Sequence, residues 1–219
     1  MEILYSDNHI IVVNKPPGLA TEATEGESVE SHIKEWVKEH YKKSGAVFVR
    51  AVHRLDKPVS GVLLLAKTSK ALERLHASFR GKQVEKRYVA LVEGVVEQEE
   101  GSMEDYLVHD FFRASVVGSE HPKAKRALLS YRVRRKNYEN SLVEIDLYTG
   151  RYHQIRVQFS SRGHPIMNDG KYGARFIKDG GNIALHQERL VFPHPISKKE
   201  LVFFSSSDDL LETFSKKPV

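Results

Sequence analysis

The chain of 219 residues contains no cysteine. This absence excludes disulfide frameworks, thiolate zinc sites, iron–sulfur clusters and cysteine nucleophiles. No segment approaches the roughly 20 consecutive apolar residues that a membrane-spanning helix needs, and the first residues, Met1–Tyr5, lack the basic-then-apolar pattern of a secretory signal. We therefore expect a cytoplasmic protein that has no membrane as a partner.

The composition is that of an ordinary globular protein, with 40% hydrophobic and 29% charged residues. Because no low-complexity tract, linker or repeat interrupts the chain, we expect one domain that spans residues 1–219. Lys and Arg (34) outnumber Asp and Glu (29), which gives a formal net charge of +5. This excess permits a surface that binds nucleic acid but does not require one, since many basic enzymes bind no polyanion.

Hydrophobic patterning predicts a mixture of strands and helices. Two continuous apolar runs indicate buried strands: Ile10–Val13 and Val62–Ala66. Four other segments have strand composition: residues 87–94, 128–134, 142–148 and 201–204.

Helices are expected from a cap at Ser28 towards Gly45, from Thr68 to Gly81, and over residues 153–162 up to Gly163. The polar stretch Glu97–Glu104 is expected to be a solvated turn. The irregular order of elements favours an α+β fold with a mixed, largely antiparallel central sheet flanked by helices.

A dense polar segment, Val52–Gly61, precedes one of the predicted strands and indicates a shaped loop at a sheet edge. Within it, Asp56 is close in sequence to Arg54 and Lys57, cations that could hold a desolvated carboxylate in its ionised form. Such a carboxylate is suited to act as a nucleophile or general base. The alternative, which the residues alone favour, is an aspartate that only caps the turn or pairs with Arg54.

Two further segments combine basic and aromatic residues. In Gly150–Val157, a helix that starts near His153 would place amide donors beside Arg151 and Arg156, where an anion could bind, or it could be a solvated basic surface. In Lys86–Leu91, Tyr88 could be a core residue or could stack on an unpaired base. The spacing alone leaves both alternatives open in each segment.

Taken together, these segments resemble the RluA-type RNA pseudouridine synthases. The pattern H-R-L-D-x-x-T-S-G of that family is matched by His53–Gly61. Four other blocks follow the order of the family: Asn14–Leu19, Lys86–Gly94, Gly150–Val157 and Gly163–Ile166. The resemblance extends over roughly residues 3 to 205, a consistency that a chance match to one motif lacks.

The resemblance implies an isomerase, an intramolecular transferase that converts uridine into pseudouridine in structured ribosomal or transfer RNA. It implies that Asp56 is the catalytic carboxylate, that Tyr88 packs against the target base and is a candidate to remove its C5 proton, and that Arg156 pairs with Asp56. A base inside a helical stack must be flipped out to be reached. RNA binding and base flipping are expected of Arg54, which takes the place of the displaced base, and of His53, Arg151 and Lys86.

Three positions depart from the family pattern: Val59 and Tyr152 replace threonine, and Gln158 replaces a frequent histidine. None of them is one of the three expected catalytic residues, so they bear on substrate fit. Because Ile3–Asn8 already resembles the first strand of the catalytic domain, we expect no separate N-terminal RNA-binding domain.

Metal and cofactor chemistry find no support in the motifs. Eleven histidines are present, but there is no H-E-x-x-H pattern, and His186–Arg189 lacks the second histidine of such a site. No phosphate-binding glycine loop occurs either, so we expect no metal and no cofactor. The resemblance implies that the partner is RNA, and we expect a monomer. The competing hypothesis is a non-catalytic RNA-binding protein of the same fold that acts as a chaperone or assembly factor. The intact set of Asp56, Tyr88 and Arg156 argues against it.

Overall fold

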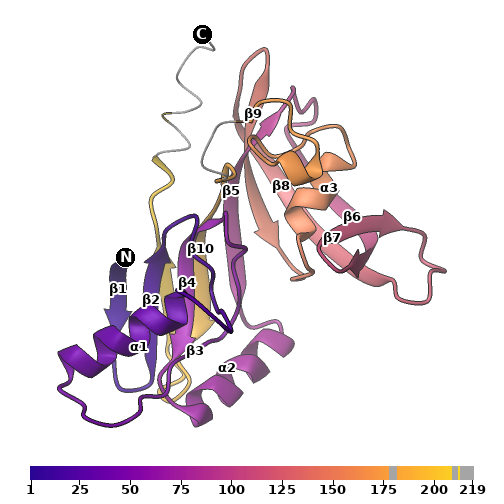
Figure 1. Ribbon diagram of the computed structural model, residues 1–219. Helices are drawn as coiled ribbons and strands as arrows, with labels where there is room; N and C mark the ends of the chain where they lie inside the picture. The colour runs from indigo at the N-terminus through magenta and orange to yellow at the C-terminus, as the bar shows by residue number, and fades with distance from the viewer. Residues whose placement is uncertain (178–181, 209–211, 213–219) are drawn as a thin grey trace. The chain divides into compact units, whose positions relative to one another are not determined.

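The computed structural model describes residues 1–177, 182–208 and 212 (Figure 1). They group into two compact units. The first unit contains Met1–Glu85 and Arg189–Ser205, and the second contains Lys86–Glu188 and the chain from Ser206 onwards. The expectation of one domain over residues 1–219 stays a prediction.

The first unit is built from two helices and a set of strands. Its elements are β1 (Glu2–Ser6), β2 (Ile10–Lys15), α1 (Val29–His40), β3 (Arg50–Ala51), β4 (Ser60–Ala66), α2 (Ser69–Arg80) and β11 (Glu200–Phe204). β2 pairs with β1 and β4, and β4 also pairs with β3, in each case antiparallel. β11 pairs with β10 (Leu185–Pro193), which like β5 (Glu85–Glu93) extends across the division between the units.

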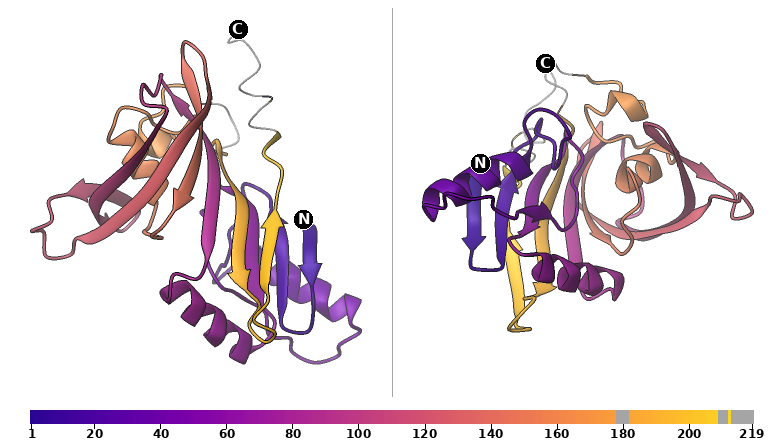
Figure 2. Two further views of the ribbon diagram at one scale, coloured as in Figure 1. Left: turned by 180° about the vertical axis from the view of Figure 1, so that it is seen from behind. Right: turned by 60° about the horizontal axis from the view of Figure 1, so that its bottom comes forward.

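The two continuous apolar runs form the centre of the first unit, as the sequence predicts. Every residue of Ile10–Val13 and Val62–Ala66 is 0% exposed. Ala71 and Leu75 of α2 belong to the same buried cluster as alternate residues of β2 and β4. In the right panel of Figure 2, α1 and α2 lie on opposite sides of these strands. The strands are therefore covered on both faces, which explains why their sequences are continuously apolar.

Local capping explains where both helices begin. The side chains of Ser28 and Thr68 accept hydrogen bonds from backbone N–H groups in the first turns of α1 and α2. α2 ends before Gly81, as expected, but α1 ends at His40, before the expected stop at Gly45. Tyr41 caps α1 instead, with its N–H directed at carbonyls of the last turn.

In its described residues, the second unit consists of antiparallel strands, a short α-helix and a 3₁₀ turn. It contains most of β5, together with β6 (Glu100–Asp110), β7 (Arg113–Val117), β8 (Lys125–Lys136), β9 (Asn140–Leu147), α3 (Gln154–Ser160) and the 3₁₀ turn η1 (Gly170–Tyr172). Hydrogen bonding places the strands in the order β5-β9-β8-β6-β7. The strands curve around α3 (Figure 2). An α+β fold with a largely antiparallel sheet flanked by helices is confirmed.

Two expectations for the second unit need correction. The stretch Glu97–Glu104 is an exposed, non-strand segment only up to Glu99, because β6 begins at Glu100 and pairs with β8. Its polar side chains face solvent and form cross-strand ion pairs such as Glu104 with Arg126, while Met103 is buried. The third helix is shorter than residues 153–162, since His153 has a left-handed φ of 53° and the helix runs from Gln154 to Ser160.

Within the described ranges, no helix is long and apolar enough to cross a membrane.

Candidate active site

Asp56 lies on the loop between β3 and β4, and the backbone of this loop is held by Thr21. The buried Thr21 hydroxyl donates to the carbonyl of Leu55 at 2.8 Å and accepts from the N–H of the same residue at 3.1 Å. On the other side of Asp56, its own carbonyl accepts from the N–H of Val59 at 3.0 Å. Both backbone groups of Leu55 are thus satisfied by one side chain, which restricts the peptide that carries Asp56.

Lys15, the last residue of β2, is the second clamp on this loop. Its side chain is fully buried, and Nζ donates to the carbonyls of Pro16 at 2.9 Å, Leu19 at 2.7 Å and Lys57 at 3.2 Å. The carbonyl of Lys57 also accepts from the N–H of Gly18 at 2.8 Å. The three donor positions of the ammonium are therefore all used, and they join the Asn14–Leu19 block to the residue that follows Asp56.

Lys15 is also a cation that interacts electrostatically with Asp56. Burial lowers the pKa of Lys15 to about 8, and the negative charge of Asp56 acts in the opposite direction. The sequence instead drew attention to Arg54 and Lys57. Arg54 forms an ion pair with Glu22 at 3.0 Å between largely exposed side chains, and Lys57 is exposed. Sequence reasoning missed Lys15 and Thr21, although Lys15 stood in a block that the family resemblance had marked.

Replacing Lys15 with methionine is expected to lower the free energy of unfolding by about 3 kcal/mol, because the carbonyls of Pro16 and Leu19 lose their donor at about 1–3 kcal/mol each, while the carbonyl of Lys57 keeps the N–H of Gly18. Denaturant titration followed by circular dichroism measures this loss. Lys57→Met is the control, since the exposed Lys57 side chain takes no part in the clamp, and should change stability by less than about 0.5 kcal/mol. Equal stability of the two variants would show that the clamp is not needed.

The remaining motif residues of the first unit pack into the fold around Asp56. His53 Nε2 accepts from the N–H of Leu64 at 3.3 Å, and the ring stacks on Phe79 with centroids 5.5 Å apart. Val59, the residue in place of the family threonine, is 2% exposed, so its methyl groups are buried where a hydroxyl would need a partner.

In the second unit, Tyr88 lies in β5 and is buried. Its hydroxyl donates to Oε1 of Gln187 in β10 at 2.6 Å. A tyrosine in this position combines a largely covered ring with an oriented hydroxyl. Gln187 was not singled out by its sequence context, because it is 99 residues away from Tyr88 in the chain.

Arg156 in α3 forms a buried bidentate ion pair. Its Nε and Nη2 donate to the two carboxylate oxygens of Asp169 at 2.7 and 2.8 Å, and the guanidinium lies over the ring of Tyr172, 5.0 Å from its centroid. The Tyr172 hydroxyl accepts from the N–H of Ala114 at 2.8 Å and is 2.7 Å from Nδ1 of His153. Arg156, which was expected to help form an anion site or a solvated basic surface at the helix start, is therefore part of a buried ion pair. Its partners Asp169 and Tyr172 were not indicated by the sequence.

The other expected RNA-binding residues of the second unit are more accessible. Arg151 is exposed, and its Nε donates to the carbonyl of Arg126 at 2.9 Å. Lys86 is partly buried, and burial lowers its pKa to about 8. The structure thus places His53, Arg54 and Asp56 in the first unit and Lys86, Tyr88, Arg151 and Arg156 in the second.

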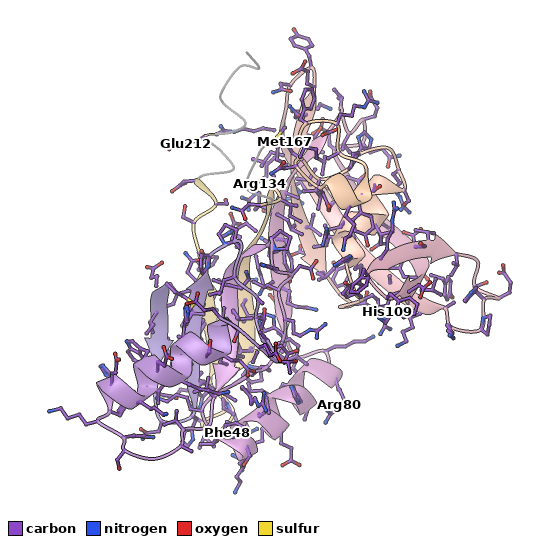
Figure 3. All side chains as sticks on the ribbon, viewed as in Figure 1. Phe48, Arg80, His109, Arg134, Met167 and Glu212 are labelled. Atoms are coloured by element: carbon purple, nitrogen blue, oxygen red, sulfur yellow. The ribbon has the colours of Figure 1, made fainter. Side chains whose placement is uncertain are left out.

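The basic run on β8 is largely neutralised by carboxylates. Arg134, which is labelled in Figure 3, donates to Glu188 and Glu144, and these carboxylates raise the pKa of its guanidinium. Arg132 pairs with Glu100, and Lys136 pairs with Glu99. Across the described part of the chain, no group of three or more histidine, aspartate or glutamate side chains is arranged to hold a metal ion.

Comparison with known proteins identifies the family of this chain. The sequence model of the RNA pseudouridylate synthase family matches residues 9–161. The ribosomal large subunit pseudouridine synthase C of Buchnera aphidicola (subspecies Baizongia pistaciae) is 34% identical over 222 residues, covering 98% of this chain and 69% of that protein. The enzyme of the same name from Vibrio cholerae is 34% identical over 216 residues, covering 96% of this chain and 67% of that protein.

The fold has a close counterpart among solved structures. Human RNA pseudouridylate synthase domain containing 4 superimposes with a TM-score of 0.81 over 100% of this chain and 95% of that one, at 24% sequence identity. The chain therefore belongs to the RluA-type RNA pseudouridine synthase family, and its enzyme class is that of the isomerases.

Proposed function

We propose that this protein isomerises uridine to pseudouridine in ribosomal RNA, with Asp56 as the catalytic carboxylate. The observation that supports this most directly is the Asp56 loop, whose backbone is bonded by Thr21 on one side and by Lys15 on the other. A carboxylate on a loop whose backbone is held on both sides, close enough to a buried ammonium to interact with it, is suited to keep its orientation during the reaction. Two relatives named for the large ribosomal subunit favour ribosomal RNA over transfer RNA as the substrate.

In the proposed reaction the target uridine leaves the RNA stack before chemistry begins. The Asp56 carboxylate attacks either the uracil ring or C1′ of the ribose, and the N1–C1′ bond breaks. The base then rotates, a bond forms between C5 and C1′, and the bond to Asp56 breaks so that the carboxylate is regenerated. The C5 proton is removed, with Tyr88 as the candidate base, and N1 takes up a proton. Substrate and product are isomers, so no cofactor is consumed. Arg54 fills the space of the flipped base, and Arg156 pairs with Asp56.

The test of this function is release of tritium from RNA that carries 5-tritiated uridine, because only loss of the C5 hydrogen frees the label. The full chain is incubated with ribosomal RNA or transfer RNA from cells that lack the protein. We expect release from ribosomal RNA, at positions that pseudouridine mapping then identifies. Binding without release would favour the non-catalytic alternative, and release only from transfer RNA would overturn the substrate assignment.

Tyr88→Phe is expected to lower kcat for tritium release by about 100-fold, the size of a general acid–base contribution. The variant should also lose about 1–2 kcal/mol of stability, since Gln187 Oε1 would lack its donor. Combining Tyr88→Phe with Gln187→Leu should restore stability and leave kcat low. Tyr138→Phe, which changes a fully exposed tyrosine, serves as the control. Recovery of activity in the double variant would show that the hydroxyl of Tyr88 has only a structural role.

A further inference from the structure

Lys86 occupies a distinctive place in the second unit. It lies in β5 two residues before Tyr88, so the two side chains project from the same face of the strand. β5 runs antiparallel to β9 with Arg87 opposite Asp146, which brings Lys86 to the point where β9 ends and the segment towards Gly150 begins. A Cβ atom added to Gly150 would lie 3.4 Å from Nζ of Lys86.

The Lys86 ammonium has no anionic partner in the part of the chain that the structure describes. Among the residues that the structure describes, none accepts a hydrogen bond from it or forms an ion pair with it. The adjacent Arg87, in contrast, pairs with Asp146 at 2.8 Å and Glu144 at 3.2 Å. A partly buried ammonium without an acceptor destabilises the fold, and burial accordingly lowers its pKa to about 8. Packing therefore does not account for a lysine at this position.

Gly150 provides an independent observation at the same place. It is not one of the glycines with positive φ, so its backbone conformation does not require glycine. The Lys86 Nζ is also the one described atom within 4 Å of a Cβ built there, so crowding by backbone does not require it either. Because Gly150 has no side chain, the space beside the Lys86 ammonium is open.

We propose that Lys86 binds a phosphodiester group of the RNA strand next to the target uridine, in the space that Gly150 leaves open. An ammonium has three donors and no acceptor, and phosphate oxygens are its matching acceptors. The shared face with Tyr88 places this contact beside the flipped nucleotide. The inference rests on the proposed function, and it adds the chemical group that Lys86 recognises.

The test removes the positive charge of Lys86 and keeps a side chain of similar length. Lys86→Met in the full chain is expected to weaken binding of the RNA substrate by about 10-fold at moderate salt. The slope of log K against log salt should become less steep by the amount that corresponds to about one phosphate contact. KM for tritium release should rise more than kcat falls. Because an unpaired ammonium is removed, the variant should unfold at the same temperature as the wild type or at a higher one. Lys86→Arg should retain most of the affinity.

Two companion variants complete the experiment. Gly150→Ala places a methyl group against the ammonium and should weaken RNA binding with no loss of thermal stability. Lys125→Met removes an exposed lysine of the same unit and is the matched control for charge, with a smaller effect on affinity.

The inference is overturned if Lys86→Met binds RNA with the affinity and salt slope of the wild type. It is also overturned if this variant unfolds at a lower temperature, which would make Lys86 a structural residue. Failure of the proposed function has a different signature, since the wild type itself would then release no tritium.

Discussion

Asp56→Asn is expected to abolish tritium release from 5-tritiated uridine in RNA, with a loss of at least about 1000-fold in kcat. Asparagine has nearly the shape of aspartate but no negative charge, so neither attack on the substrate nor charge stabilisation remains. The Thr21 hydroxyl bonds to the backbone C=O and N–H of Leu55, and the Lys15 ammonium bonds to the backbone C=O of Lys57. None of these hydrogen bonds involves the Asp56 carboxylate. The loop should therefore keep its conformation, and RNA should still bind.

The control for this variant is a carboxylate outside the loop. Asp110→Asn changes an exposed aspartate at the end of β6 and should release tritium at the wild-type rate. Thermal unfolding of Asp56→Asn should differ little from that of the wild type, which separates loss of chemistry from loss of fold. Equal tritium release by Asp56→Asn and the wild type would rule out Asp56 as the catalytic residue.

Asp169→Asn is expected to reduce the free energy of unfolding by about 3–5 kcal/mol, the cost of removing one partner of a buried ion pair. The side chains of Arg156 and Asp169 are 5% and 1% exposed. The guanidinium keeps its charge at every accessible pH, so it would remain buried after its bidentate carboxylate partner is gone. Guanidinium chloride titration, with extrapolation to zero denaturant, measures the difference.

The chain offers a matched control for burial. Arg87 and Asp146 also form a bidentate pair in the same unit, but their side chains are 33% and 39% exposed. Asp146→Asn should therefore cost less than about 1 kcal/mol, because water and salt screen an exposed pair. If the two variants lost the same stability, burial would not be what makes the Arg156–Asp169 pair strong.

Local patterns predicted most of the fold of the first unit. The runs Ile10–Val13 and Val62–Ala66 are continuous and apolar, and the caps at Ser28 and Thr68 act within one helical turn, so both signals can be read from neighbouring residues. β6 could not be predicted in the same way. Its polar side chains, beginning at Glu100, are stabilised by cross-strand pairing with β8, a partner distant in sequence.

The sequence by itself determined the family resemblance and the identity of the expected reactive residues Asp56, Tyr88 and Arg156, since each lies in a contiguous motif. Only the tertiary structure decided which residues form the hydrogen bonds and ion pairs around them. Thr21 bonds Leu55 across 34 residues, Lys15 reaches Lys57 across 42, and Asp169 pairs with Arg156 across 13. The physical reason is that a hydrogen bond or ion pair depends on distance in space, and the closure of the chain that brings such partners together leaves no periodic signal along the sequence. The absence of cysteine excluded thiol chemistry, and the fold then showed which oxygen atoms accept hydrogen bonds from the buried cations Lys15 and Arg156.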